Sequence, residues 1–239
     1  MHPKDRLLVA LDVDGRDEAL ALADCLRDVV GGFKVGMRLF YRQGPGIVSE
    51  VAERSPFVFL DLKLHDIPQT VGQAVRALVG LGAAMLNVHA GGGAAMLRAA
   101  AEAAAEEAGR IGRPRPLLVA VTVLTSLDDS SVRELGFETG ARNLALRWAE
   151  LAMHCGLDGV VASAWEASAI RALTGPQFRI VSPGVRPAGE AAGDQRRVAT
   201  PAAAVSAGAD YLVIGRPITG APDPVNAARR IVAEMGGLN

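Results

Sequence analysis

The sequence predicts an α/β protein whose strands close into a single (β/α)8 barrel, the TIM-barrel architecture, over residues 1–239. Short apolar runs alternate with longer helical patterns about eight times, which is the repeat number of this barrel. Several runs are apolar throughout, as expected of parallel strands that are covered on both faces. No linker or shift in composition divides the chain, and 50% of its residues are hydrophobic, which suffices for one substantial core.

The expected strands are, in order, 7–13, 32–36, 57–62, 85–89, 117–123, 159–162, 179–182 and 211–214. The expected helices are 16–29, 68–81, 93–108, 142–154, 164–173, 201–207 and 224–235. An open, doubly wound sheet is the alternative architecture. It would need fewer strands and ideally a Gly-x-Gly-x-x-Gly loop after the first of them. The first strand instead ends in Leu11-Asp12-Val13-Asp14-Gly15, so we favour the barrel.

Two of the predicted loops are longer than the few residues usual for a connection from strand to helix. They are 125–140, after the fifth strand, and 183–200, after the seventh. Loops of this kind lie at the C-terminal face of a barrel, where such enzymes place their active sites. We therefore expect the functional site at that end of the molecule.

The composition argues against several classes of protein. The formal net charge is −1 and only 4% of the residues are aromatic, so a nucleic-acid partner is not expected. Cys25 and Cys155 lie far apart without Cys-x-x-Cys spacing, which indicates neither a disulfide framework nor a zinc site. There is no signal-peptide pattern, and no apolar stretch approaches the roughly 20 residues needed to span a bilayer. We therefore expect a cytoplasmic protein with no membrane partner.

The histidines do not predict a metal centre. His65 and His89 follow different strands, without the third His, Asp or Glu that a metal site would need. His89 is expected to pack or to support other residues near the barrel mouth. There is no Ser-His-Asp arrangement or nucleophile elbow either. We therefore expect neither a metal nor a cofactor.

The segment after the third strand predicts acid–base chemistry. Alternate residues of a strand share a face, so Asp61 and Lys63 should point together into the barrel mouth, with Asp66 following the strand end. A Lys between two carboxylates is held cationic, which suits a proton donor that works without a metal. A structural ion pair between Asp61 and Lys63 is the alternative. Asp66 ahead of Ile67-Pro68 could likewise be the N-cap of the next helix.

Two further charged residues belong to the first two strands. Asp12 closes the first, and Lys34 lies within the apolar run Phe33-Lys34-Val35-Gly36 of the second. An unpaired ammonium is costly to bury, so Lys34 needs partners. Asp12 and Asp61 would supply them at neighbouring strand ends. Charges on three consecutive strands favour a functional site over a purely structural role.

The last two strand ends predict a phosphate site. Gly184 and Arg186 follow the seventh strand, and Gly215 and Arg216 follow the eighth. These two loops form the usual phosphate grip of a TIM barrel, in which backbone N–H groups at a short helix meet the anion. Arginine adds a planar fork that suits phosphate oxygens.

Three other polar residues are candidates for contact with the same ligand. Gln195 lies in the long loop between the last two strands and could reach it. Thr125 and Ser126, after the fifth strand, could donate hydrogen bonds to a ligand carbonyl or imide. Isolated residues of this kind are more often turn or N-cap groups.

Taken together, these motifs resemble the orotidine 5′-phosphate decarboxylase family. Residues 61–70, Asp-Leu-Lys-Leu-His-Asp-Ile-Pro-Gln-Thr, are similar to its motif Asp-x-Lys-x-x-Asp-Ile-Pro-Asn-Thr. Other segments that resemble its signatures, in the same order, are 8–12, 34–36, 121–126, 183–186, 194–195 and 214–217. The resemblance therefore runs from the first strand to the last. Gln69, where the family usually has Asn, is the departure.

The resemblance implies decarboxylation of orotidine 5′-phosphate to UMP in pyrimidine biosynthesis, without a metal, with the following roles. Lys63 would be the proton donor, flanked by Asp61 and Asp66; Asp12 and Lys34 would hold the ribose hydroxyls; Thr125 and Ser126 would meet the pyrimidine edge; and Arg186, Gln195, Gly215 and Arg216 would hold the phosphate. The family is typically a homodimer in which Asp66 and Thr70 reach into the neighbouring subunit's site.

Two other functions remain as alternatives. Metal-dependent relatives, such as 3-keto-L-gulonate-phosphate decarboxylase and hexulose-phosphate synthase, share Asp-x-Lys-x-x-Asp but resemble one another in having Glu-Val-Gly where this chain has Lys34-Val35-Gly36. A cation at position 34 would repel their Mg²⁺, which argues against them. A non-catalytic binder of nucleotides or sugar phosphates would keep the phosphate grip but would not need the Asp–Lys–Asp array.

Overall fold

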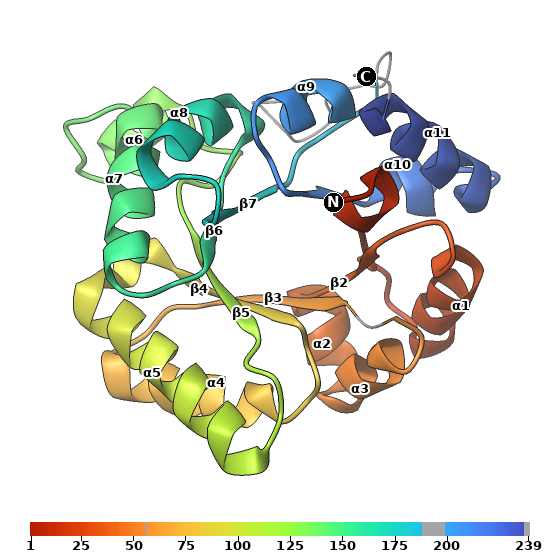
Figure 1. The fold of residues 1–239 in the computed structure, drawn as a ribbon, viewed down its shortest axis with the longest axis horizontal. Helices are drawn as coiled ribbons and strands as arrows, with labels where there is room; N and C mark the ends of the chain where they lie inside the picture. The colour runs from red at the N-terminus through yellow and green to blue at the C-terminus, as the bar shows by residue number, and fades with distance from the viewer. Residues whose placement is uncertain (56, 188–198, 237–239) are drawn as a thin grey trace.

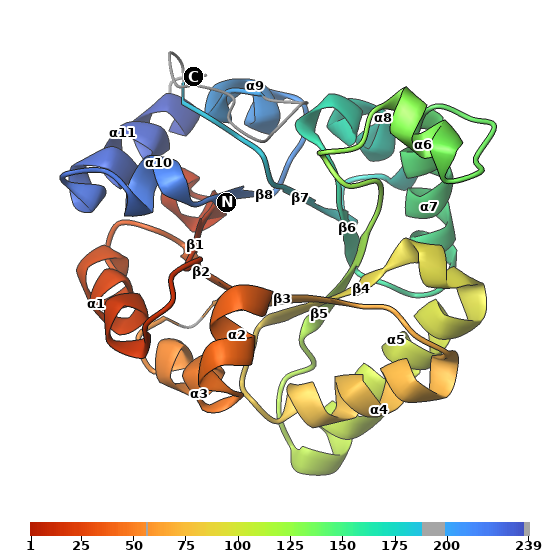
Figure 2. The same cartoon turned by 180° about the vertical axis from the view of Figure 1, so that it is seen from behind.

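The computed structural model, which describes residues 1–55, 57–187 and 199–236, is a closed barrel of eight parallel strands. Each strand pairs with its neighbours in sequence, and β1 pairs with β8 to complete the circle. The helices form a ring outside the strands, with α4 beside α5 and α11 closing the ring against α1 (Figure 1, Figure 2). The (β/α)8 TIM barrel predicted from the sequence is confirmed.

All eight expected strands are present, with small differences at their ends. They are β1 (Leu7–Ala10), β2 (Gly32–Gly36), β3 (Val58–Leu64), β4 (Met85–His89), β5 (Leu117–Val121), β6 (Gly159–Val161), β7 (Arg179–Ser182) and β8 (Tyr211–Ile214). β1 ends three residues earlier than expected, because the chain leaves the sheet after Ala10 and only the N–H of Leu11 still donates to the carbonyl of Lys34.

The helices are α1 (Arg16–Leu26), α2 (Met37–Gln43), α3 (Gly46–Ala52), α4 (Pro68–Val79), α5 (Gly93–Ile111), α6 (Asp129–Glu134), α7 (Ala141–His154), α8 (Ala164–Thr174), α9 (Pro201–Ser206), α10 (Arg216–Thr219) and α11 (Pro224–Gly236), with 3-10 turns η1 (Pro3–Arg6) and η2 (Ala90–Gly92). The sequence did not predict α2, α3, α6 or α10. All are short, and α2 and α3 are separated by Gly44 at a φ of 73°. None of the described helices combines the length and apolar character needed to cross a membrane.

The apolar core forms two layers, as strand alternation requires. One cluster fills the barrel interior and includes Leu8, Phe59, Met85 and Val119. A larger cluster lies between the strands and the helices. It includes Val9 and other strand residues whose side chains point away from the barrel interior. The barrel is therefore packed below its mouth, and the polar residues that line the cavity lie on or beyond the C-terminal halves of the strands.

The strand β3 is irregular where it reaches that end. Leu60 pairs with Leu86 of β4, but the next pair is Leu64 with Val88, so β3 advances four residues while β4 advances two. Within this bulge Lys63 has a φ of 52°, the one positive φ of a non-glycine residue among the described positions. Left-handed backbone costs about 1–2 kcal/mol for such a residue, so surrounding contacts must hold it.

Candidate active site

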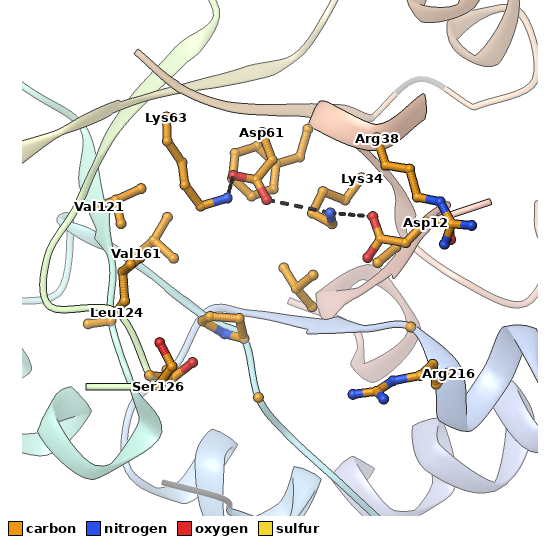
Figure 3. Close-up of a pocket in the computed structure, with 18 of the residues that line it drawn as sticks. Asp12, Lys34, Arg38, Asp61, Lys63, Val121, Leu124, Ser126, Val161 and Arg216 are labelled. Atoms are coloured by element: carbon orange, nitrogen blue, oxygen red, sulfur yellow. Dashed lines mark hydrogen bonds and ion pairs between the residues drawn. The ribbon is translucent and has the colours of Figure 1, made fainter. Parts of the chain in front are cut away.

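A cavity of about 600 Å³ opens at the C-terminal ends of the strands (Figure 3). The charged residues that line it are Asp12, Lys34, Arg38, Asp61, Lys63, Arg186 and Arg216, and other lining residues include Thr125, Ser126, Gly184 and Gly215. The described part of the lining thus has five cationic and two anionic side chains. Such a wall suits a small ligand with several negative charges.

Lys34 is the buried centre of the charged side of this cavity. Its side chain is 9% exposed, and its Nζ lies 2.9 Å from Oδ1 of Asp12 and 3.5 Å from Oδ2 of Asp61. Gly36 permits this arrangement, since a Cβ there would lie 2.7 Å from the Lys34 Nζ and 3.0 Å from the Asp12 carboxylate. The small residue at position 36 thus leaves room for the ion pair.

Asp61 links Lys34 to Lys63. Its Oδ1 accepts hydrogen bonds from Nζ of Lys63 and from Nδ2 of Asn87, both at 2.6 Å. Burial alone would raise the pKa of Asp61, but the positive charge of Lys34, then that of Lys63, and the hydrogen bonds from Lys63 and Asn87 lower it. Asp61 is therefore held as a carboxylate. Figure 3 shows the resulting row of alternating charges, from Asp12 through Lys34 and Asp61 to Lys63.

Asp66 and Thr70 are not among the residues that line the cavity. Asp66 is exposed and its carboxylate accepts a hydrogen bond from the N–H of Ile67 at 2.6 Å. Ile67 is itself the N-cap of α4, with Pro68 at the first helical position, so the interpretation of Asp66 as the N-cap is wrong. Thr70 and the divergent Gln69 are exposed in the first turn of α4. Within the protomer, therefore, Lys63 contacts Asp61 but Asp66 does not line its cavity.

Of the residues expected at the phosphate, Gly184, Arg186, Gly215 and Arg216 line the cavity. Arg186 is 9% exposed, and its backbone N–H donates to the carbonyl of Ala199 at 3.0 Å. Arg216 begins α10, with Gly215 as the N-cap residue, and Figure 3 draws it on the far side of the pocket from Lys63. Gly184 has a φ of 72°, which favours glycine. Gln195 lies outside the described residues.

Thr125 and Ser126 also line the cavity. Both follow β5, as expected, and Ser126 is exposed at the rim (Figure 3). The predicted long loop that they begin contains α6. This helix is capped by Asp128, whose carboxylate accepts a hydrogen bond from the N–H of Ser131.

Sequence reasoning missed two polar residues of the site, Asn87 and Arg38. Asn87 is 1% exposed in β4, and the signal that could have found it is the same as for Lys34, a lone polar residue in an apolar strand. Arg38 is exposed at the rim. It donates from Nη1 to the carbonyl of Asp12 at 3.1 Å and from Nε to Asp14 at 2.7 Å. Its role depends on a helix, α2, that the sequence did not predict.

The two histidines near the mouth pack against each other. The rings of His65 and His89 are stacked with centroids 5.1 Å apart, and Trp148 contacts His89 edge-on. Burial lowers the pKa of His89, and the charges of His65 and Lys63 lower it further. His89 is thus a packing residue, as the sequence suggested. Among the residues that the structure describes, no three His, Cys, Asp or Glu side chains are grouped to hold a metal.

Comparison with known proteins gives the family. Residues 5–231 match the model of the "Orotidine 5'-phosphate decarboxylase / HUMPS family". The chain belongs to this family. A relative from Moorella thermoacetica named orotidine 5′-phosphate decarboxylase is 58% identical over 236 residues, which are 98% of this chain and 94% of that protein. One of the same name from Paramagnetospirillum magneticum is 51% identical over 95% of this chain and 97% of its own length.

Solved structures agree with this assignment. Orotidine 5′-phosphate decarboxylase from Lactobacillus acidophilus matches with a TM-score of 0.83 and 35% identity, covering 96% of this chain and 98% of that one. A conserved protein from Geobacillus kaustophilus, described as uncharacterized, matches with a TM-score of 0.81 and 40% identity over 96% and 99% of the two chains. The chain is thus a member of a family of carbon–carbon lyases and is itself a decarboxylase.

Proposed function

We propose that this protein converts orotidine 5′-phosphate to UMP without a metal ion, and that Lys63 delivers the proton to C6 of the pyrimidine. The observation that carries the proposal is the row of charges at the cavity wall. There Lys63 and Asp61 share a 2.6 Å contact, and Lys34 ties Asp61 to Asp12. An ammonium at the mouth of a barrel, next to a carboxylate held anionic, can both stabilise a carbanion and protonate it.

The charge of the cavity fits this substrate. The five cationic and two anionic side chains of the described lining leave an excess of positive charge. Orotidine 5′-phosphate has one carboxylate and a phosphate that is largely dianionic at neutral pH. The phosphate would lie near Arg186 and Arg216, and the pyrimidine carboxylate near Asp61 and Lys63. Figure 3 draws Arg216 on the opposite side of the pocket from Lys63.

In the proposed reaction the bond between C6 and the carboxylate breaks, CO₂ leaves, and the electron pair stays on C6. Lys63 then transfers a proton from Nζ to C6, which gives UMP, and the neutral amine regains a proton from water. The negative charge of Asp61 repels the carboxylate of the bound substrate, and this repulsion ends when CO₂, which is neutral, departs. At ~4 Å and an effective dielectric of about 20 it amounts to roughly 4 kcal/mol, or about three powers of ten in rate. Stabilisation of the anion by Lys63 contributes more.

The other proposed contacts follow from the places of the residues. Asp12 and Lys34 would bind the ribose hydroxyls, and Thr125 and Ser126 the pyrimidine edge. The backbone N–H groups at the start of α10, after Gly215, would meet the phosphate together with the two arginines already named. Gln195 is proposed as a further phosphate contact.

We also propose that residues 1–239 act as one decarboxylase domain and that the enzyme is a cytoplasmic homodimer. In that dimer Asp66 and Thr70 would complete the neighbouring subunit's site. The support is their exposure at the start of α4, outside their own cavity, next to Ile67, which is 65% exposed although it is apolar. A second subunit packed on this face would bury the Ile67 side chain and bring the two polar residues beside it to the rim of the contact.

The metal-dependent branch of the same family is the second candidate, because the matched family model covers both. Lys34 opposes it, since an ammonium 2.9 Å from Asp12 and 3.5 Å from Asp61 occupies the place where a cation would bind those carboxylates. A non-catalytic binder is opposed by the Asp61–Lys63 pair, which a phosphate grip alone would not require.

The test is the ultraviolet absorbance of orotidine 5′-phosphate after addition of purified protein in the presence of EDTA. The proposal predicts that the pyrimidine absorbance changes completely from that of orotidine 5′-phosphate to that of UMP, that one UMP forms per substrate consumed, and that the rate does not change on adding Mg²⁺. Decarboxylation that stops with EDTA and resumes with Mg²⁺ would contradict the metal-free proposal. Binding of UMP without turnover would contradict the proposal as well.

A further inference from the structure

Asn87 is a buried polar residue that the proposed mechanism does not use. It lies on the inward face of β4, two residues after Met85 of the barrel-interior cluster, and is 1% exposed. An apolar side chain at this position would extend that cluster, as Val119 does on β5. Burying an amide instead is costly unless both of its ends are hydrogen-bonded.

Both ends of the amide are in fact bonded, and both partners belong to the bulge in β3. Nδ2 of Asn87 donates to Oδ1 of Asp61 at 2.6 Å, and Oδ1 of Asn87 accepts the backbone N–H of Lys63 at 2.8 Å. These partners fix the orientation of the amide, because a backbone N–H can only donate and a carboxylate held anionic can only accept. If the amide were rotated by 180°, its NH₂ group would face the Lys63 N–H and its oxygen would face the Asp61 carboxylate, and both hydrogen bonds would be lost.

The bulge explains why a side chain is needed there. Lys63 lies between the pairs Leu60–Leu86 and Leu64–Val88, where the ladder between β3 and β4 is interrupted. Its N–H therefore bonds to the Asn87 side chain instead of a β4 carbonyl. The same residue has the positive φ, so this bond helps to hold a backbone conformation that would otherwise relax.

We propose that Asn87 is a positioning residue for proton transfer: its amide holds the carboxylate of Asp61 and the backbone of Lys63 in the arrangement that aims the ammonium into the cavity. This inference rests on the proposed role of Lys63 as proton donor. Asn87 is not among the residues that line the cavity, so it is not expected to touch the substrate. It acts through two residues that do, and it should therefore affect kcat and leave the affinity for nucleotide nearly unchanged.

The test compares two variants with the wild type. Asn87→Leu removes both hydrogen bonds at similar volume and should lower kcat by about ten- to a hundred-fold, the usual range for loss of a hydrogen bond to a charged group. KM and the Kd of UMP should change less than about threefold, because the groups that bind phosphate and ribose are untouched.

Asn87→Asp keeps the acceptor for the Lys63 N–H but replaces the donor to Asp61 by a second carboxylate. The charged groups that face this position are Asp61 and Lys63 from β3, with Lys34 beyond Asp61 on β2 and His89 on β4 itself. Two adjacent carboxylates share a proton as the pH falls, which restores a donor. The kcat of this variant, divided by that of the wild type at the same pH, should therefore rise at least threefold from pH 8 to pH 5.5.

Asp158 offers a matched control at the opposite end of the barrel. Its carboxylate also accepts a backbone N–H of the neighbouring strand, that of Leu118 at 2.7 Å, but it lies away from the cavity. Asp158→Ala should lower the melting temperature and leave kcat per folded molecule, counted by UMP binding, unchanged. A purely structural role for Asn87 predicts that same pattern for both of its variants.

Two outcomes would overturn the inference: a kcat per folded molecule for Asn87→Leu within threefold of the wild type, or a relative kcat for Asn87→Asp that does not depend on pH. The second measurement decides the matter if Asn87→Leu does not fold. Lys63→Ala is measured alongside. An active Lys63→Ala would refute the proposed role of Lys63 as proton donor, whereas unchanged Asn87 variants beside an inactive Lys63→Ala would refute the positioning role alone.

Discussion

Replacing Lys34 by methionine removes the central ammonium of the charged wall while keeping a side chain of similar length. The attraction between Nζ of Lys34 and Oδ2 of Asp61, 3.5 Å apart, is about 4–5 kcal/mol at an effective dielectric of about 20. Removing one partner of a buried pair costs about 3–5 kcal/mol. Asp61 keeps Lys63 and Asn87 as partners, so we expect the lower end, about 3 kcal/mol.

This loss is measurable by urea unfolding and by thermal melting. For a chain of 239 residues, about 3 kcal/mol corresponds to a melting temperature roughly 6–12 °C lower. Arg54→Met is the matched control, since Arg54 forms an ion pair of 3.2 Å with Asp24, whose carboxylate is half exposed and screened by water. The control should melt close to the wild type.

The pH dependence follows from the pKa of Asp61. Burial would raise it, but Lys34 and then Lys63 lower it below the ordinary value of 3.8. A carboxyl with a lowered pKa stabilises the fold at pH above that ordinary value, and this contribution is lost as the pH falls through the lowered pKa. The difference between wild type and Lys34→Met should therefore be largest near neutral pH and shrink below about pH 4. A difference under about 1 kcal/mol at pH 7, or one that stays constant down to pH 3, would refute the reasoning.

Three further predictions concern the shared site, the phosphate grip and the close approach at Gly36. Mixing Lys63→Ala with Asp66→Ala should restore part of the activity, because one site of the mixed dimer retains both residues; no recovery after proven subunit exchange would contradict a shared site. Arg186→Ala should cost about 1.5–3 kcal/mol in kcat/KM on orotidine 5′-phosphate and far less on orotidine, which lacks the phosphate; equal losses on both would show that Arg186 only supports the fold. Gly36→Ala would place a Cβ 2.7 Å from the Lys34 Nζ and should raise KM more than it lowers the melting temperature; an unchanged KM would argue against a substrate contact by Lys34.

The strands could be predicted from the sequence because their signal is local. Eight apolar runs bounded by turns gave every strand within a few residues, and Lys34 stood out as a charge inside one of them. The short helices were not predictable in the same way. α2 and α3 have seven residues each and are interrupted by Gly44, so neither shows a periodic pattern long enough to recognise.

The finer geometry of the site depends on contacts between distant parts of the chain. The alternation rule places Asp61 and Lys63 on one face, but the bulge that sets the backbone of Lys63 arises from the register between β3 and β4. The same register places the Asn87 side chain within hydrogen-bond distance of Asp61 and of the Lys63 backbone. The proposed role of the exposed Asp66 in a neighbouring subunit's site requires a second chain, and no pattern within one chain specifies how two chains pack. The motif nevertheless indicated the decarboxylase family, since its residues recur in order along nearly the whole chain.

The central claim, that Lys63 delivers the proton, is tested most directly by the turnover of Lys63→Ala on orotidine 5′-phosphate under EDTA, with UMP affinity measured on the same preparation. Lys63 is the residue whose ammonium reaches the cavity from the bulge of β3, 2.6 Å from Asp61. If Lys63 is the proton donor, the folded variant still binds UMP and shows no detectable decarboxylation. Decarboxylation near the wild-type rate by such a protein would contradict that role.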